Sequence, residues 1–218
     1  MKNNEDIFSF LQLFSSATAF LPFIFALLYF KYARNYLMPI FILIFISTLM
    51  EIFNLNPGFL NQKTMILILR CFTVIEFILI SLFYIGFFKN YFKPVVAYLF
   101  IPCFLIVTYM DYCQGGSNSQ DNFSFSTESV CFILYSLFLF YYVSKHLLFE
   151  NLLMSPVFWI NTAILVYFAG NLALFVFSNY LIVTDPKMHI MLWSLIHTFF
   201  NISFNSLITI GFWKTKIR

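Results

Sequence analysis

Seven apolar segments divide the sequence and restrict it to one class of fold. They cover approximately residues 7–30, 36–55, 65–88, 95–110, 130–146, 157–180 and 190–213. Each is close to the roughly 20 residues that a helix needs to cross a bilayer. With 61% hydrophobic and 10% charged residues, the chain has more apolar surface than a soluble domain of 218 residues buries. The sequence therefore predicts an all-α membrane protein, a single seven-helix transmembrane bundle over residues 1–218.

The basic residues indicate how the bundle is oriented. One set of alternate connections and the C-terminal tail hold Lys31, Arg34, Lys89, Lys93, Lys145, Lys214, Lys216 and Arg218, and the opposite side holds Lys2, Lys63 and Lys187. Because basic loops stay in the cytoplasm, we expect the N-terminus outside and the C-terminus inside, in the inner (cytoplasmic) membrane. The longest connection, residues 111–129, is rich in Gly and Ser and is predicted to be a polar outer loop that contains Glu128.

Two pairs of segments share short patterns. Residues 81–89 (SLFYIGFFK) match residues 206–214 (SLITIGFWK), and both runs end a predicted helix. Residues 39–41 and 54–55 match residues 156–158 and 171–172 at one constant offset. The sequence therefore predicts a 3+1+3 repeat, in which the first three helices recur as the last three.

The last segment, residues 190–213, contains no Asp, Glu, Lys or Arg, but it holds a line of polar residues. Ser194, His197, Asn201 and Asn205 lie three, four and four residues apart, which places them on one helix face. Imidazole and carboxamide groups are costly in hydrocarbon unless they have partners. We therefore expect this face to meet other helices or a wet cavity.

Other segments carry polar residues at similar depths, and this convergence predicts a polar cavity in the outward-facing half of the bundle. Its candidate ligand-binding residues are Glu51, Asn54, Arg70, Glu76, Tyr167, Asn171, His197, Asn201 and Asn205. Each also has a simpler structural interpretation. Arg70 and Glu51 would form an ion pair between helices, the asparagines would form hydrogen bonds between helices, and His197 would be a packing residue.

Several kinds of chemistry find no support in the motifs. The last segment has no lysine for a retinal Schiff base, no HxxxH or HExxH pattern indicates zinc, and no GxSxG indicates a serine hydrolase. No cofactor, metal ion or catalytic residue is predicted, and no motif indicates nucleic-acid binding. Cys71, Cys103, Cys113 and Cys131 form no CxxC pair, although a disulfide between Cys71 and Cys113 is geometrically allowed.

Residues 75–89 (IEFILISLFYIGFFK), 155–171 (SPVFWINTAILVYFAGN) and 195–216 (LIHTFFNISFNSLITIGFWKTK) carry a resemblance. They resemble an uncharacterised seven-span family of Bacteroidota, whose members stand alone or precede sensor histidine kinase domains. The family's recurring positions correspond here to Glu76, Pro156, Trp159, Asn171, His197, Asn201 and Asn205. The resemblance implies a sensing or ligand-binding module without established chemistry, which signals through a membrane or cytoplasmic partner protein.

Three functions remain open on the sequence alone. The first is a receptor-like sensor in the lipid bilayer, which is not an enzyme and binds a small polar or lipid-derived molecule from the periplasmic side. There, Arg70 would orient an anionic group, and Glu76 and His197 would make binding depend on protonation. The second is a small transporter that alternates access around Glu76 and Asn201. The third is an intramembrane lipid hydrolase that uses Glu51, Glu76 and His197.

Overall fold

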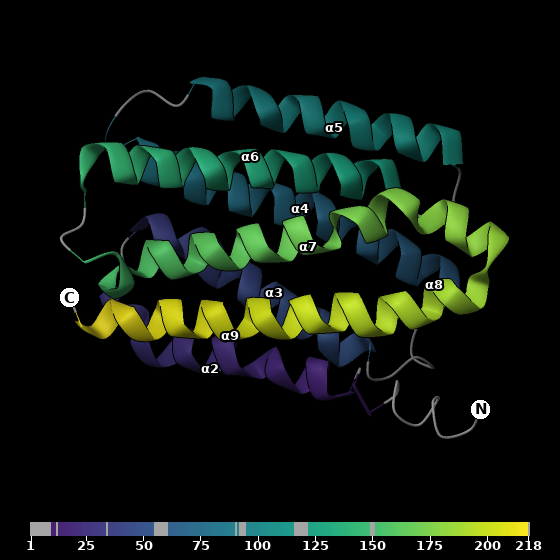
Figure 1. Cartoon of the computed structure of the whole chain (residues 1–218), viewed down its shortest axis with the longest axis horizontal. Coiled ribbons are helices and arrows are strands. Elements are labelled where there is room, and N and C mark those ends of the chain that lie inside the picture. The colour runs from purple at the N-terminus through teal and green to yellow at the C-terminus, as the bar shows by residue number, and fades with distance from the viewer. Residues whose placement is uncertain are drawn as a thin grey trace. The chain divides into compact units, whose positions relative to one another are not determined.

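The computed structural model describes residues 10–11, 13–33, 35–54, 61–89, 91, 95–115, 122–148 and 151–217, which are helical almost throughout and contain no strand. The α-helices are α2 (Phe20–Tyr29), α3 (Met38–Asn54), α4 (Gln62–Phe88), α5 (Val95–Gly115), α6 (Asn122–His146), α7 (Pro156–Thr184), α8 (Pro186–Leu192) and α9 (Thr198–Lys214) (Figure 1). A π-helical segment, η5 (Trp193–His197), joins α8 to α9. Residues 13–18 are helical as well and lead into α2.

The predicted membrane fold is confirmed at the level of its helices. Six helical runs among the described residues are long and apolar enough to cross a bilayer: Leu13–Tyr32, Asn35–Phe53, Thr64–Phe88, Phe123–His146, Pro156–Thr184 and Pro186–Lys214. The fourth predicted segment corresponds to α5, whose apolar part, Tyr98–Cys113, is shorter. Large apolar side chains such as Leu28, Phe177 and Phe199 are more than half exposed, as lipid contact requires. The chain is a multi-pass membrane protein.

The predicted polar loop over residues 111–129 is mostly helical, which corrects the sequence analysis. Helix α5 continues to Gly115 and α6 begins at Asn122, so only residues 116–121 lie between them, outside the described residues. A side-chain cap explains the early start of α6. Asp111 Oδ2 accepts hydrogen bonds from Ser124 N (2.9 Å) and Ser124 Oγ (2.8 Å) and so satisfies a free amide of the first turn. As a consequence, Glu128 lies within a candidate membrane span and not in an outer loop.

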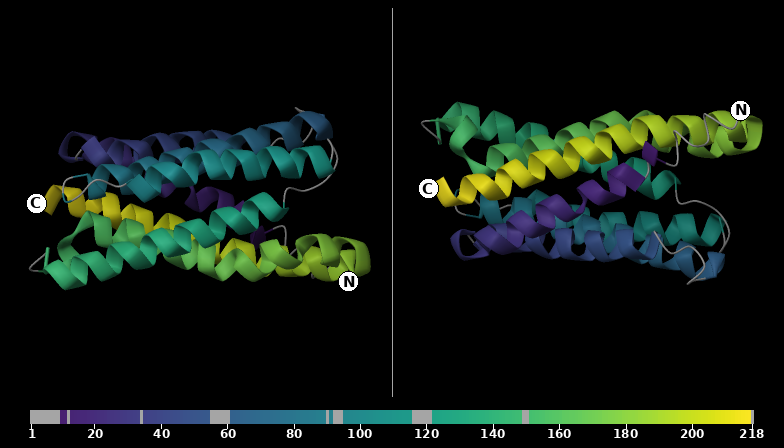
Figure 2. Two further views of the ribbon diagram at one scale, coloured as in Figure 1. Left: turned by 90° about the horizontal axis from the view of Figure 1, so that it is seen from above. Right: turned by 90° about the horizontal axis from the view of Figure 1, so that it is seen from below.

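The chain forms two compact units. Unit 1 comprises Met1–Ala33 and Ser129–Arg218, and unit 2 comprises Arg34–Glu128, so that α6 begins in unit 2 and continues in unit 1. Within unit 1, α9 packs against α7 and also against α2, which runs obliquely along it (Figures 1 and 2). Within unit 2, α4 packs against both α3 and α5. Because these boundaries differ from those of the 3+1+3 repeat, the repeat stays a prediction, as does the orientation in the membrane.

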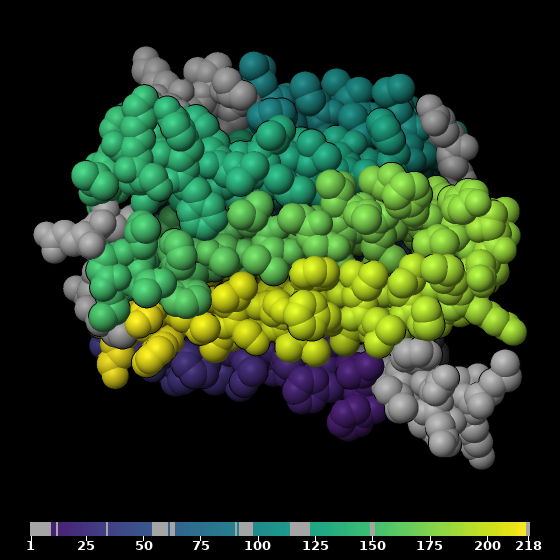
Figure 3. Space-filling model, in the orientation of Figure 1, coloured from purple at the N-terminus to yellow at the C-terminus, as the bar shows by residue number. Residues whose placement is uncertain are grey.

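A glycine in the last turn of α9, Gly211, lies at the contact between α7 and α9, near the end of α7 that adjoins η4 (Leu152–Met154). A Cβ atom on Gly211 would lie 2.8 Å from Ile160 Cγ1 and 3.4 Å from the Pro156 carbonyl oxygen. Small residues at such positions let two membrane helices approach closely, and dispersion contacts then hold the pair together. The side chains of α7 and α9 meet along the face that Figure 3 shows. This pair of helices is the scaffold on which the candidate site is built.

We predict that Gly211→Leu lowers the thermal stability of the protein, because the new side chain must displace Ile160 or separate α7 from α9. Overpacking of this kind costs about 1–3 kcal/mol. The measurement is thermal unfolding of the purified protein in detergent, followed by circular dichroism. The matched control is Ser206→Leu, which adds the same side chain at an exposed position of α9 and should leave the melting temperature nearly unchanged. Equal melting temperatures for the two variants would contradict the proposed role of Gly211.

Candidate functional site

The structure divides the predicted site residues between the two units. Tyr167, Asn171, His197, Asn201 and Asn205 belong to unit 1, whereas Glu51, Asn54, Arg70 and Glu76 belong to unit 2. The single cavity shared by all of them stays a prediction.

In unit 1, the His197 side chain lies among aromatic rings of two helical segments. Its ring stacks on that of Trp193, with centroids 4.6 Å apart, and meets the rings of Tyr167 at 5.9 Å and Phe175 at 6.5 Å. Tyr167 and Phe175 lie eight residues apart on α7, so Asn171, midway between them, occupies the same helix face. We call Tyr167, Asn171 and Phe175 of α7, together with Trp193 and His197 of η5, the α7–η5 seam.

Two polar atoms of this seam are buried without a hydrogen-bond partner among the described residues. Asn171 is fully buried, and its Nδ2 donates to the Tyr167 carbonyl oxygen at 2.9 Å, but its Oδ1 accepts no hydrogen bond. The Nδ1 atom of His197 is buried and unpartnered as well. Leaving such a group unsatisfied costs about 1–3 kcal/mol, so buried orphans are rare and call for an explanation.

The π-helical geometry of η5 gives the seam its other unusual feature. Single π-helical turns within α-helices are uncommon and occur frequently at functional sites. Here the turn covers Trp193–His197 and lies directly before α9. The side chains of His197 and of Trp193, which lies one turn earlier, therefore come from a stretch in which the helix is widened.

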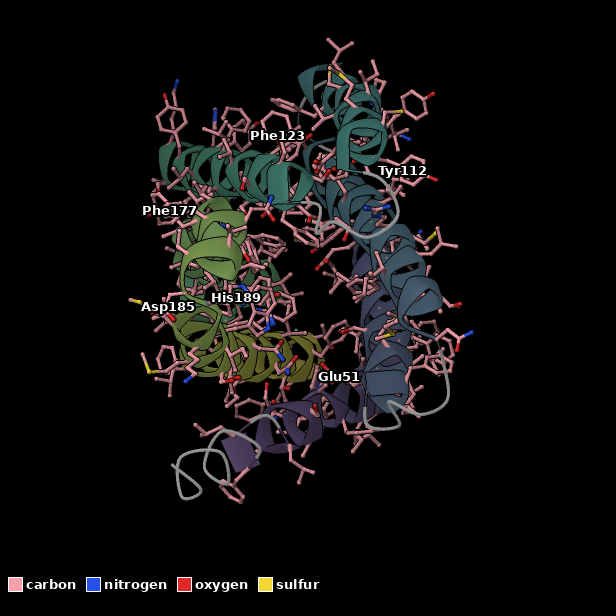
Figure 4. All side chains as sticks on the ribbon, turned by 90° about the vertical axis from the view of Figure 1, so that its right-hand side faces the viewer. Glu51, Tyr112, Phe123, Phe177, Asp185 and His189 are labelled. Atoms are coloured by element: carbon pink, nitrogen blue, oxygen red, sulfur yellow. The ribbon has the colours of Figure 1, made fainter. Side chains whose placement is uncertain are left out.

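The seam continues towards the hairpin between α7 and α8. A hydrogen bond of 2.7 Å joins Ser178 Oγ of α7 to His189 Nε2 of α8, and the His189 ring lies 5.8 Å from that of Trp193. Figure 4 shows His189 and Phe177 on opposite sides of this hairpin. His189, Trp193 and His197, spaced four residues apart, thus form one continuous column against α7.

Asn201 and Asn205 form a second polar contact, with the N-terminal helical residues. Asn201 Nδ2 donates to Ser15 Oγ at 2.9 Å, and Asn205 Nδ2 donates to Thr18 Oγ1 at 3.1 Å. Both bonds connect α9 to the helix that precedes α2. The predicted single polar face of the last segment is therefore divided, because α9 is flanked by two helices: His197 contacts α7, and the two asparagines contact residues 15 and 18.

In unit 2, the charged candidates lie on α3 and α4. Arg70 is buried, and its guanidinium carbon lies 5.1 Å from the ring centroid of Tyr112 on α5. Glu51 and Glu76 are half-buried. Asn54 is the last residue of α3, and its side chain lies outside the described residues. The ion pair between Arg70 and Glu51 stays a prediction.

Unit 2 also contains a carboxylate that the sequence analysis placed incorrectly. Glu128 is 2% exposed, and its Oε1 has no hydrogen-bond partner among the described residues. It lies near enough to Glu76 for the two carboxylates to interact electrostatically. The many serines around Glu128 lower the local hydropathy, and this made a membrane-spanning helix look like a loop.

Sequence reasoning also overlooked Trp193, Phe175, Ser178 and His189. The four-residue spacing of His189, Trp193 and His197 was a signal for their common face. Ser178 carried no such signal, because its contact with His189 depends on how the hairpin closes.

The described residues show neither a metal-binding cluster nor a disulfide. They include no group of three or more His, Cys, Asp or Glu side chains placed to hold a metal ion. All four cysteines are free thiols, of which Cys131 alone is buried, so the disulfide between Cys71 and Cys113 does not form.

Searches of protein-family models, of curated proteins and of solved structures found no match to this chain. The resemblance to the seven-span family of Bacteroidota therefore stays a prediction.

We predict that Asn205 and Thr18 are energetically coupled. In a double-mutant cycle of Thr18→Val and Asn205→Leu, the coupling energy should be about 0.6 kcal/mol, the average for hydrogen bonds between membrane helices, and at most about 1.7 kcal/mol. Thermal unfolding of the four proteins measures it. The control cycle pairs Thr18→Val with Ser203→Ala, whose hydroxyl donates to the Phe199 carbonyl oxygen of its own helix. The control should be additive, and an equally additive Thr18–Asn205 cycle would show that their contact contributes nothing.

Proposed function

We propose that this protein is a receptor-like membrane module that binds a small polar or lipid-derived molecule in the α7–η5 seam and signals through a partner protein. One observation carries the proposal: Asn171 Oδ1 and His197 Nδ1, two polar atoms from facing helical segments, are both buried and both without a partner. We further propose that it lies in the inner membrane with the N-terminus outside, and that it belongs to the seven-span family that its sequence resembles.

The composition of the seam supports binding over a purely structural role. Ligand sites are mostly apolar and aromatic, with a small number of polar groups that fix the orientation of the ligand. The rings of Tyr167, Phe175 and Trp193 surround His197 in this way. A ligand that hydrogen-bonds to the two free atoms would recover the free energy lost by burying them. Asn161, which is equally buried, shows the contrast: its amide donates to the Ser136 carbonyl oxygen of another helix at 3.1 Å, whereas the Asn171 amide donates within α7 and its Oδ1 has no partner among the described residues.

The other two functions receive less support. The transporter hypothesis depends on Glu76 and Asn201, and the amide nitrogen of Asn201 already donates to Ser15. The hydrolase hypothesis requires Glu51, Glu76 and His197 in one centre, and it stays a prediction, as does that shared centre. We therefore keep these functions as outcomes of the test.

The test is a thermal-shift screen of the purified protein against membrane lipids, amino acids, sugars and aromatic metabolites. We expect at least one class of compound to stabilise the wild-type protein, since a ligand at 100 times its Kd adds about 2.7 kcal/mol. His197→Phe should abolish the shift, because phenylalanine retains the stacking on Trp193 but removes the ring nitrogens. Asn179→Leu, at an exposed position of α7, is the control and should retain it.

Three results would contradict the receptor function. The first is a screen in which no compound stabilises the wild-type protein, and the second is stabilisation that persists in His197→Phe. The third is activity of another kind: solute flux in proteoliposomes that Glu76→Gln abolishes would indicate a transporter, and hydrolysis of a labelled lipid that His197→Ala abolishes would indicate an enzyme.

A further inference from the structure

The hydrogen bond made by the Asn171 amide restricts what its free atom can bind. Because Nδ2 donates to the Tyr167 carbonyl oxygen, the orientation of the amide is determined and the unpartnered atom is the carbonyl oxygen Oδ1. An amide oxygen only accepts hydrogen bonds. A ligand that satisfies Asn171 must therefore present an O–H or N–H donor.

His197 adds a second requirement. Its Nδ1 donates in one neutral tautomer and accepts in the other. A single hydroxyl group that reaches both atoms would meet both conditions, because it would donate its proton to Asn171 Oδ1 while its oxygen accepts from His197 Nδ1–H. A carbonyl group fails the first condition, since it has no proton to donate.

The charge of the helices in unit 1 favours a neutral ligand. Residues 13–29, 129–144, 156–184 and 188–213, which form the body of its helices, contain no Asp, Glu, Lys or Arg. An ionised ligand in the seam would thus find no opposite charge on these segments, and an unpaired charge in an apolar interior is very costly. The role of Arg70 in orienting an anionic ligand stays a prediction.

The rings of the seam favour an aromatic ligand. Trp193, Tyr167 and Phe175 present faces and edges around the His197 ring at centroid distances of 4.6, 5.9 and 6.5 Å. Aromatic pairs in such stacked or tilted arrangements gain about 0.5–1.5 kcal/mol beyond the burial of their surface. An aromatic ligand that carries a hydroxyl would add contacts of this kind to the two hydrogen bonds.

We infer that the α7–η5 seam binds a neutral, lipid-soluble quinol through one phenolic hydroxyl, which donates to Asn171 Oδ1 and accepts from His197 Nδ1–H. This inference rests on the proposed function, since it names the ligand class of the same site. Binding alone is inferred, and the quinol leaves the seam chemically unchanged.

Three probes that share one ring and one short alkyl tail test the inference: decylubiquinol, its oxidised quinone, and the dimethyl ether of the quinol. Only the quinol has a donor, while all three have acceptor oxygens. We expect the wild-type protein to bind the quinol about tenfold more tightly than either other probe, the equivalent of one hydrogen bond of about 1.4 kcal/mol. Binding is measured anaerobically by isothermal titration in detergent. Equal affinity for the three probes would overturn the inference without any variant.

Two variants assign the preference to the seam. Asn171→Leu, with a side chain of nearly the same volume, should weaken quinol binding about tenfold and leave quinone binding unchanged. Asn179→Leu should preserve the wild-type preference. A quinol preference that survives in Asn171→Leu would place the probe elsewhere and overturn the inference.

The two proposals fail differently. If the quinol does not bind but another compound gives a shift that depends on His197, the ligand class is wrong and the receptor function stands. If neither the quinol nor any compound of the screen binds, both proposals are wrong.

Discussion

In hydrocarbon, a polar side chain has no water to bond with and must form its hydrogen bonds with other protein groups. In unit 1, such hydrogen bonds connect neighbouring helices. The asparagines of α7 and α9 show how this works. Asn161 donates to the backbone of α6, and Asn201 and Asn205 donate to hydroxyl groups of the N-terminal helix. Each of these bonds connects two helices, so polar groups that are costly in isolation instead determine which helices of the unit become neighbours.

The α7–η5 seam differs from these three contacts, because two of its buried polar atoms have no hydrogen-bond partner among the described residues. The same helices that satisfy Asn161, Asn201 and Asn205 leave Asn171 Oδ1 and His197 Nδ1 unsatisfied. They do so next to a π-helical turn and among aromatic rings, although a neighbouring pair, Ser178 and His189, is joined by a short hydrogen bond. These two atoms are the ones that the proposed ligand would satisfy.

The two units differ in chemical character. Unit 1 places neutral polar groups and aromatic rings along its helices, whereas unit 2 places Arg70, Glu76 and Glu128 within its own. In unit 2 the arginine lies against an aromatic ring and the two carboxylates interact with each other. Charged groups within a membrane are expensive and are usually functional, so unit 2 is a second region in which function should be sought.

Hydropathy, helix length and spacing were sufficient to predict an all-helical membrane protein, its helical segments, and Asn171 and His197 as candidate residues, because these properties depend on local sequence. Tertiary contacts decided the rest. The hydrogen bond from Ser124 to Asp111 caps the start of α6, so that residues 122–129 are helical and not a loop. The polar face of the last segment contacts two different neighbours, and the rings of Trp193 and Phe175 pack against His197. A sequence pattern shows which face of a helix is polar, but the partner of each side chain depends on which helix packs against that face.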